Sequence, residues 1–382
     1  MTRTQNVKKK QQRKNRVLLL MLLLLLTFTI GGTATYAWFT ANRTVSVKDI
    51  EVEVTAVNGL EISADAINFG PAINQNDIVS AVSTGYTNAR NQMPKVLGHI
   101  STDGKLQSNG RLNMFFGTVS VNEDDGDYYL TTLQEGEMNC NDLTSSEAEA
   151  LGTGVASIAC TNSSSAAHFM AFDIFLRVSS ETDIDLVNST VKSAEGQDRG
   201  IKNTARIALV YEGTNTAVED PDTGEVVTSA YLNSTGAQSL ARAGDGTSAN
   251  DNYVYIWEPN ADTHTAAGIA SAATYFNIAS GLSTSGSDPI AYRGVNQTIT
   301  GVGVPLSSVT DTTGPYAQYF TPVVIDSSTA ASSTTFSNEY MTLPAGISKI
   351  RVYFWVEGQD VDTENEATGT NMKLNLQFAI RS

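Results

Sequence analysis

Apolar and polar residues alternate along several segments of the chain, which is the pattern of a strand with one buried face. The longest alternation covers residues 372–381, where every even position up to 380 is apolar. Residues 169–178 and 350–357 alternate in the same way. In residues 45–54 the alternation changes phase once, which predicts a β-bulge near Lys48. These segments predict half-buried antiparallel strands.

Weaker patterns extend the same picture to the rest of the chain. Further predicted strands are Leu112–Val121, Tyr128–Leu133, Ala205–Glu212, Val226–Leu232, Tyr253–Trp257 and Gln318–Ile325. Short helical stretches are Asp77–Val82, Thr144–Leu151 and Ala237–Arg242. Asp220–Glu225 (DPDTGE) predicts a hairpin turn, because proline presets φ and glycine accepts positive φ. The sequence therefore predicts an all-β fold, an antiparallel β-sandwich of jelly-roll kind with long loop insertions, after an N-terminal signal helix.

Residues 1–37 have the composition of an export leader. They contain seven cations and no acid, and Val17–Ile30 is an apolar run of 14 residues. This run is shorter than the roughly 20 residues that span a bilayer. Two glycines end it, and small residues precede a cleavage site between Ala37 and Trp38. An uncleaved membrane anchor is the alternative, and both interpretations place residues 38–382 outside the cytoplasm.

The part of the chain after the leader is long enough for one elaborated β-sandwich, and two sandwiches divided near Thr214 are the alternative. Removing residues 1–37 changes the formal net charge from −16 to −23. An acidic surface of this kind repels nucleic acid and anionic lipid headgroups. We therefore expect no nucleic-acid partner, and membrane contact only through an uncleaved leader.

The chain has two cysteines, Cys140 and Cys160. In an oxidising compartment, a disulfide between them would close a loop of about 20 residues and stabilise the fold by roughly 3 kcal/mol. Two free thiols are the alternative. The cysteines and the three dispersed histidines have no zinc-ligand spacing.

Two acid-rich stretches are candidates for weak calcium binding, because Ca²⁺ prefers clustered carboxylate oxygens. The first stretch contains Glu123, Asp124, Asp125 and Asp127. The second contains Glu357, Asp360, Asp362 and Glu364. A solvated acidic loop is the alternative in each case, and we expect no other cofactor.

The sequence shows no catalytic constellation. His99, His168 and His264 lack the sequence context of a nucleophilic triad, and His264 is interpreted as a polar loop residue. A glycosidase needs an acid and a base on facing strands, and nothing distinguishes Asp173 and Glu357 from other acids predicted to be exposed. We therefore expect a protein that is not an enzyme.

Cleavage after residue 37 would produce an aromatic, strand-prone N-terminus. This candidate self-assembly strand contains Trp38, Phe39, Val45 and Val47. Such a segment adds to the open sheet edge of a neighbouring molecule, and repeated addition that does not close on itself produces filaments. The alternative is that it forms the first strand of its own sandwich.

The segment LLLTFTIGGTATYAWFT, followed at once by an alternating strand, resembles the SipW-dependent signal peptides of the TasA/camelysin group. The matching positions are Gly31, Gly32, Thr33, Ala37 and Phe39. The resemblance implies a specialised signal peptidase as partner, a jelly-roll sandwich, an extracellular location and self-association through the N-terminal strand. It supplies no catalytic residues.

Together these features favour a secreted or cell-surface structural protein without enzymatic activity, such as a biofilm-matrix or fibre-forming subunit. Expected partners are a signal peptidase, further copies of the same chain, and components of the cell envelope or matrix. A surface adhesin or ligand-binding module is the first alternative. A secreted hydrolase is less favoured.

Overall fold

The structure is a computed structural model. It describes residues 47–83, 85–94, 96–122, 124–137, 166–196, 199–215, 254–260, 264–266, 268–270, 293–309, 311–323, 325, 337–360, 362–363 and 371–381. All of these belong to one unit, residues 37–382. The predicted leader and its cleavage site, both cysteines, the 226–232 strand, the 220–225 turn and two of the three short helical stretches lie outside the described residues.

Strands form most of the described structure, which confirms the predicted all-β class. The larger of the two main sheets has eight strands. In spatial order they are β10 (Ala166–Ala167), β6 (Val96–Leu97), β1 (Val47–Val57), β21 (Asn371–Ile380), β12 (Thr182–Val187) and β19 (Ser337–Leu343), with β3 (Ala72–Asn74) also pairing β1 and β13 (Thr190–Ser193) also pairing β21.

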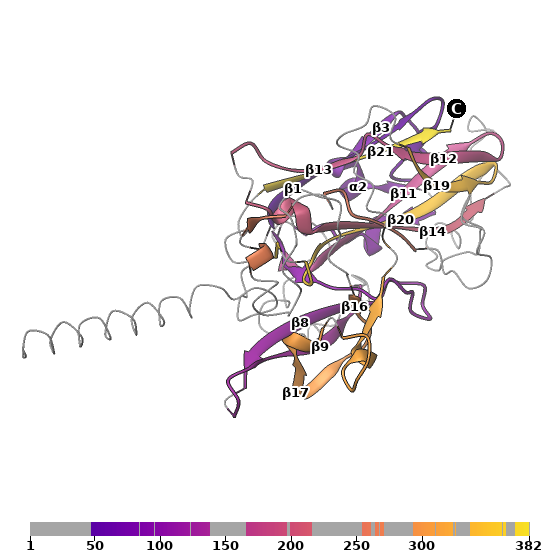
Figure 1. The fold of residues 1–382 in the computed structure, drawn as a ribbon. Helices are drawn as coiled ribbons and strands as arrows, with labels where there is room; N and C mark the ends of the chain where they lie inside the picture. The colour runs from indigo at the N-terminus through magenta and orange to yellow at the C-terminus, as the bar shows by residue number, and fades with distance from the viewer. Residues whose placement is uncertain are drawn as a thin grey trace, which may run out of the picture. The chain divides into compact units, whose positions relative to one another are not determined.

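The second main sheet has six strands, with β20 at its centre (Figure 1). Its order is β15 (Val254–Trp257), β14 (Ala205–Asn215), β20 (Gly346–Glu357), β11 (Phe169–Val178) and β2 (Glu61–Ser63), with β7 (His99–Ile100) also pairing β20. Strand β20 pairs antiparallel to β11 along one edge and antiparallel to β14 along the other.

One apolar core contains side chains from both main sheets. Val54 of β1 and Leu376 of β21 represent the eight-stranded sheet, and Phe172 of β11 and Phe354 of β20 represent the six-stranded sheet. All four side chains are fully buried. Burial of alternating apolar residues from two sheets is the packing of a β-sandwich. The jelly-roll connectivity remains a prediction.

Strand β1 confirms the predicted bulge, because its register with β21 shifts between Lys48 and Ile50. Its direction relative to β21 differs from the antiparallel pairing predicted from the sequence, since these two strands run parallel. On its other side β1 pairs β3 and β6. The described part of the candidate self-assembly strand starts at Val47, which pairs Leu97 of β6.

Shorter elements complete the described structure. A three-stranded sheet has the order β17 (Ile299–Pro305), β9 (Tyr128–Glu135) and β8 (Met114–Val121), and two-stranded sheets pair β16 (Arg293–Val295) with β18 (Phe320–Pro322) and β4 (Val82–Ser83) with β5 (Tyr86–Thr87). Helical turns are α2 (Gln75–Ser80), η1 (Asn88–Arg90), η2 (Ile201–Thr204), η3 (Leu306–Ser308) and η4 (Ala317–Tyr319). Within the described residues, no helix combines the length and the apolar character that crossing a membrane requires.

The prediction of half-buried strands is wrong for the centre of the six-stranded sheet. Every residue of β20 is buried, and so is every residue of β11 except Arg177. The face of this sheet that we expected to contact solvent is covered by a second apolar cluster, which includes Ile100, Leu112 and Met114. The alternating charged and aromatic residues of β20 are therefore interior residues.

Candidate functional site

The covered second face of the six-stranded sheet has ionisable groups toward both ends and aromatic rings between them. Along β20 it presents alternate residues, from Lys349 and Arg351 through Tyr353 and Trp355 to Glu357, because successive strand residues point to opposite faces. None of these five residues exposes any measurable surface. The face divides into two ionic clusters, one at each end of the strand.

The first cluster, here called the balanced cluster, contains three cations and three carboxylates. Arg351 Nη1 lies 2.6 Å from Asp173 Oδ1, and Arg351 Nη2 lies 2.8 Å from Glu137 Oε2. Lys349 Nζ lies 2.8 Å from Glu212 Oε2 and 3.4 Å from Asp173. The third cation is Arg111, whose Nε lies 3.6 Å from Glu137 Oε2.

Two tyrosine hydroxyls add hydrogen bonds to the balanced cluster. Tyr86 donates to Asp173 at 3.2 Å, and Tyr353 donates to Glu137. Burial raises the pKa of Asp173, but the charges of Lys349 and Arg351 outweigh burial and hold this pKa below its ordinary value. Charges that are paired and hydrogen-bonded in this way are compatible with a buried position.

The second cluster, here called the acidic cluster, has a different charge balance. Arg206 Nη2 lies 2.6 Å from Asp360 Oδ2 and 2.7 Å from Glu258 Oε1. Two further carboxylates, those of Glu357 and Asp362, lie in the same buried region and expose no surface. Glu357 accepts hydrogen bonds from neutral donors, among them the indole of Trp355 at 3.0 Å.

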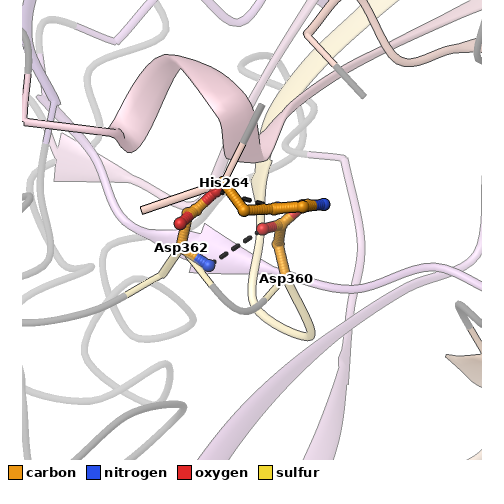
Figure 2. A group of neighbouring side chains, drawn as sticks. All are labelled: His264, Asp360 and Asp362. Carbon is orange, nitrogen blue, oxygen red and sulfur yellow. Dashed lines mark hydrogen bonds and ion pairs between the residues drawn. The ribbon is translucent and has the colours of Figure 1, made fainter. Parts of the chain in front are cut away.

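His264 joins the acidic cluster from a separate segment of the chain (Figure 2). Its Nδ1 lies 3.1 Å from Asp362 Oδ2. The other oxygen, Asp362 Oδ1, accepts hydrogen bonds from the amide and the hydroxyl of Thr265, each at 2.7 Å. The amide of Asp362 donates to Asp360 Oδ1 at 2.9 Å. His264, Asp360 and Asp362 each offer a metal-ligating atom, and these atoms lie within 4.8 Å of one another.

The pKa shifts in the acidic cluster agree with its excess of negative charge. Burial raises the pKa of Glu258 to about 7, although Arg206 opposes the shift. Burial also raises the pKa of Asp360. The hydrogen bond to Asp362 raises the pKa of His264. Each shift favours the protonation state that reduces the net negative charge.

The two predicted acid-rich stretches have contrasting positions. Asp124, Asp125 and Asp127 are exposed at the tip of the β8–β9 hairpin, where Asp125 accepts a hydrogen bond from the Tyr129 hydroxyl at 2.9 Å. Glu123 lies outside the described residues. The positions of these three acids are those of the solvated loop that we gave as the alternative to calcium binding.

The second stretch is an interior cluster instead of a surface loop. Glu357, Asp360 and Asp362 are buried, and Glu364 lies outside the described residues. His264 lies outside any helix or strand, in agreement with its interpretation as a polar loop residue, but it is only 8% exposed and contacts Asp362. Likewise Asp173 and Glu357 are buried, and not the exposed acids that the alternation predicted.

The other candidate residues are placed as follows. His99 is buried in β7, and His168 stacks on Phe116 with ring centroids 4.0 Å apart. Val47 is buried in β1, while Trp38, Phe39 and Val45 lie outside the described residues. Glu357, Asp360 and Asp362 were identifiable from the sequence as part of a dense run of acids, but the participation of Arg206, Glu258 and His264 was not.

No protein-family model, curated protein or solved structure matches this chain. The resemblance of the leader to the TasA/camelysin group therefore remains a prediction.

Proposed function

We propose that the protein is a secreted or cell-surface structural subunit without catalytic activity, and that it assembles with copies of itself in an extracellular matrix or fibre. The observation that supports this proposal best is the burial of β20 on both faces, with the ionic groups on its second face bound to one another. Strand β20 is therefore buried along its whole length, as expected for the interior of a rigid structural subunit.

The burial of the ionic groups favours a structural function over a catalytic one. A general acid or base must come within hydrogen-bond reach of a substrate. Lys349 and Glu212 have side chains with no exposed surface, and those of Asp173 and Arg351 are 2% and 0% exposed. Each of these groups forms an ion pair within the protein, so it stabilises the sheet and does not contact solutes.

The proposed route of assembly involves the segment before β1. Strand β1 pairs β21 over most of its length on one side, and on the other side it pairs β6 at residues 47–48 and β3 at residues 53–55. Strand addition to a second molecule is therefore assigned to the preceding segment, residues 38–46, which contains the aromatic pair of the predicted mature N-terminus.

This proposal is tested by imaging the purified chain 38–382 by negative-stain electron microscopy and measuring its sedimentation over a range of concentrations. We expect filaments, and we expect them to disappear when residues 38–46 are deleted. A variant in which residues 38–46 are replaced by a glycine-serine segment of equal length controls for chain length. Monomers at every concentration for the intact chain would contradict the proposal.

A ligand-binding module is the second candidate, and one feature favours it. A surface groove beside β1, β3 and β21 is lined by both acids and a cation, among them Glu51, Glu53 and Lys373. Lys373 Nζ lies 3.3 Å from Glu53 and 3.6 Å from Glu51. This candidate is favoured over assembly if the intact chain stays monomeric and binds a glycan on an array. The Lys373→Ala variant should then fail to bind the same glycan.

A further inference from the structure

Lys349 is a primary amine that lies between two carboxylates on neighbouring strands. Strand β20 carries Lys349 and pairs β14, which carries Glu212, on one side and β11, which carries Asp173, on the other. The Nζ atom lies 2.8 Å from Glu212 Oε2 and 3.4 Å from Asp173 Oδ2. The side chains of Lys349 and Glu212 have no exposed surface, and that of Asp173 is 2% exposed. The sheet therefore holds an amine against two carboxyl groups out of contact with solvent.

A β-bulge in β14 brings Glu212 to this position. The register between β14 and β20 shifts between Tyr211, which pairs Ile350, and Gly213, which pairs Lys349. Glu212 is the extra residue at this shift, and a bulge of this kind redirects a side chain. The contact of 2.8 Å shows that the redirected carboxylate meets the amine of Lys349.

The two carboxylates differ in how their negative charge is stabilised. Asp173 accepts hydrogen bonds from the Arg351 guanidinium at 2.6 Å and from the Tyr86 hydroxyl at 3.2 Å, and such bonds favour its ionised form. Both oxygens of Glu212 are buried, and neither accepts a hydrogen bond of regular geometry from the described residues, although Nζ is close to Oε2. Burial raises the pKa of Glu212, although Lys349 opposes the shift, and a raised pKa favours the neutral acid.

We propose that Lys349 and Glu212 condense to form a covalent amide bond between their side chains, and that Asp173 transfers the proton during this reaction. An amine reacts with a neutral carboxylic acid more readily than with a carboxylate, so Glu212 is the acid that is attacked. Asp173 remains ionised and lies close to the same nitrogen, which suits it to accept a proton.

The reaction begins when the Lys349 ammonium gives one proton to the Glu212 carboxylate, which produces a neutral amine and a neutral acid. The nitrogen lone pair then forms a bond to Cδ of Glu212, and one electron pair of the C=O bond moves to oxygen. Asp173 takes a proton from Nζ and gives it to the departing hydroxyl group. The C–O bond breaks, the C=O bond forms again and one water molecule leaves. Asp173 returns to its starting state, and no further reactant takes part.

The buried position favours the amide over the ion pair. Condensation removes one cation and one anion together, so two charges no longer have to be kept away from water. The fixed contact between the two groups also replaces a chance encounter, which is a large part of the barrier to such a reaction. The bond forms once per molecule without turnover, and it joins β14 to β20 covalently. It is independent of the proposed assembly through residues 38–46.

The bond is tested first by the intact mass of the purified wild-type chain 38–382, measured after denaturation and reduction of the cysteines. We expect a mass lower than the sequence mass by one water molecule. Trypsin does not cleave after an acylated lysine, so we expect a branched peptide in which residues 207–242 are joined to residues 294–351. The full sequence mass, with a peptide that ends at Lys349, would overturn the proposal whether or not the protein forms filaments.

Two lysine variants then identify the amine. We expect Lys349→Arg to have its full sequence mass and Lys373→Arg to keep the loss of one water molecule. Lys373 is a matched control, because its Nζ also lies 3.3 Å from a carboxylate, that of Glu53, but its side chain is 46% exposed. Loss of water in Lys349→Arg would overturn the proposal, as would the full sequence mass in Lys373→Arg. The branched peptide of the wild type decides the case in which Lys349→Arg fails to fold.

The roles of the two carboxylates are separated by further measurements. Among variants that circular dichroism shows to be folded, we expect Asp173→Asn to retain the full sequence mass and Asp173→Glu to lose one water molecule. Complete loss of water in Asp173→Asn, or the full mass in both variants, would overturn proton transfer by Asp173. A wild-type branched peptide that joins residues 112–177 to residues 294–351 would overturn the assignment of Glu212 as the acid that is attacked.

Discussion

Breaking an ion pair that is buried in the protein lowers the free energy of unfolding more than breaking an ion pair on its surface. Asp173 is buried between Lys349 and Arg351, whereas Lys373 bridges Glu51 and Glu53 on an exposed face. A buried ion that loses its partner remains uncompensated in a medium of low polarity, while an exposed ion is solvated by water.

We therefore predict that Asp173→Asn lowers the free energy of unfolding by about 3–5 kcal/mol, since it leaves two buried cations with one carboxylate fewer. Urea unfolding followed by tryptophan fluorescence measures the change. Lys373→Ala is the control and should have a much smaller effect, because the side chain is 46% exposed. Equal losses in the two variants would show that the buried pairs do not stabilise the fold.

A second residue-scale prediction concerns pH. Burial lowers the pKa of His99 to about 3, with a smaller contribution from His168. The unfolded chain binds a proton on this ring near pH 6.5, so the stabilising contribution is complete above that pH and is lost as pH falls toward 3. The expected slope is about 1.4 kcal/mol per pH unit.

This slope is measured as the difference between wild type and His99→Gln in urea unfolding at several pH values, which removes the contribution of other titrating groups. The two stabilities should converge as pH falls from 6.5. Parallel curves throughout that range would contradict the burial of His99 as a neutral ring.

The sequence predicts correctly whether a residue is buried when its position in the alternation and its polarity agree. The prediction fails when the two conflict. Met372 and Leu374 were predicted to be interior and are buried. Arg351 and Asp173 also alternate, but their charge implied solvent, because the sequence does not reveal that distant residues such as Leu112 cover the second face. His264 is separated from Asp362 by 98 positions, so no local pattern could indicate their contact.

At the scale of elements, the close packing of β20 against β14 depends on a glycine. Gly346 starts β20 with φ +129°, and a Cβ atom there would lie 2.0 Å from the carbonyl oxygen of Asn215 in the paired strand. Gly126 in the β8–β9 hairpin also has positive φ, +77°, but a Cβ atom there would meet nothing within 4 Å.

We predict that Gly346→Ala destabilises the protein more than Gly126→Ala. Both variants incur the cost of a left-handed or strained backbone, about 1–2 kcal/mol, but only the first also forces two strands apart. Thermal unfolding of the two variants gives the comparison. An equal decrease in melting temperature would mean that β14 and β20 tolerate the extra atom.

Strands and turns were predictable where they depend on residues that are close together in the sequence. The β8–β9 hairpin, the bulge in β1 and the full length of β21 follow from turn residues and period-two patterns. The partner and direction of each strand do not follow from such patterns. The parallel pairing of β1 with β21 is therefore a feature that only the three-dimensional structure supplies.

At the scale of the whole molecule, the acidic cluster makes contacts within one chain, whereas residues 38–46 are proposed to make contacts between chains. The cluster connects segments that are distant in one chain, since His264 contacts Asp362, so its contacts stabilise the subunit. Residues 38–46 precede a strand that pairs β21 on one side and β3 and β6 along parts of the other, and contacts made by this segment are proposed to connect subunits. The His264→Gln variant should consequently change stability without abolishing filaments, and deletion of residues 38–46 should abolish filaments without changing stability.

The β1–β21 pairing also determines when the eight-stranded sheet can form during synthesis. Thr55 of β1 donates to the carbonyl of Leu376, 321 positions further along the chain. Contacts between such distant positions form slowly, and a nascent chain lacks them until its distal residues have been translated. The ribosome must therefore complete β21 before β1 acquires this partner, so the eight-stranded sheet cannot close while the chain is still being translated.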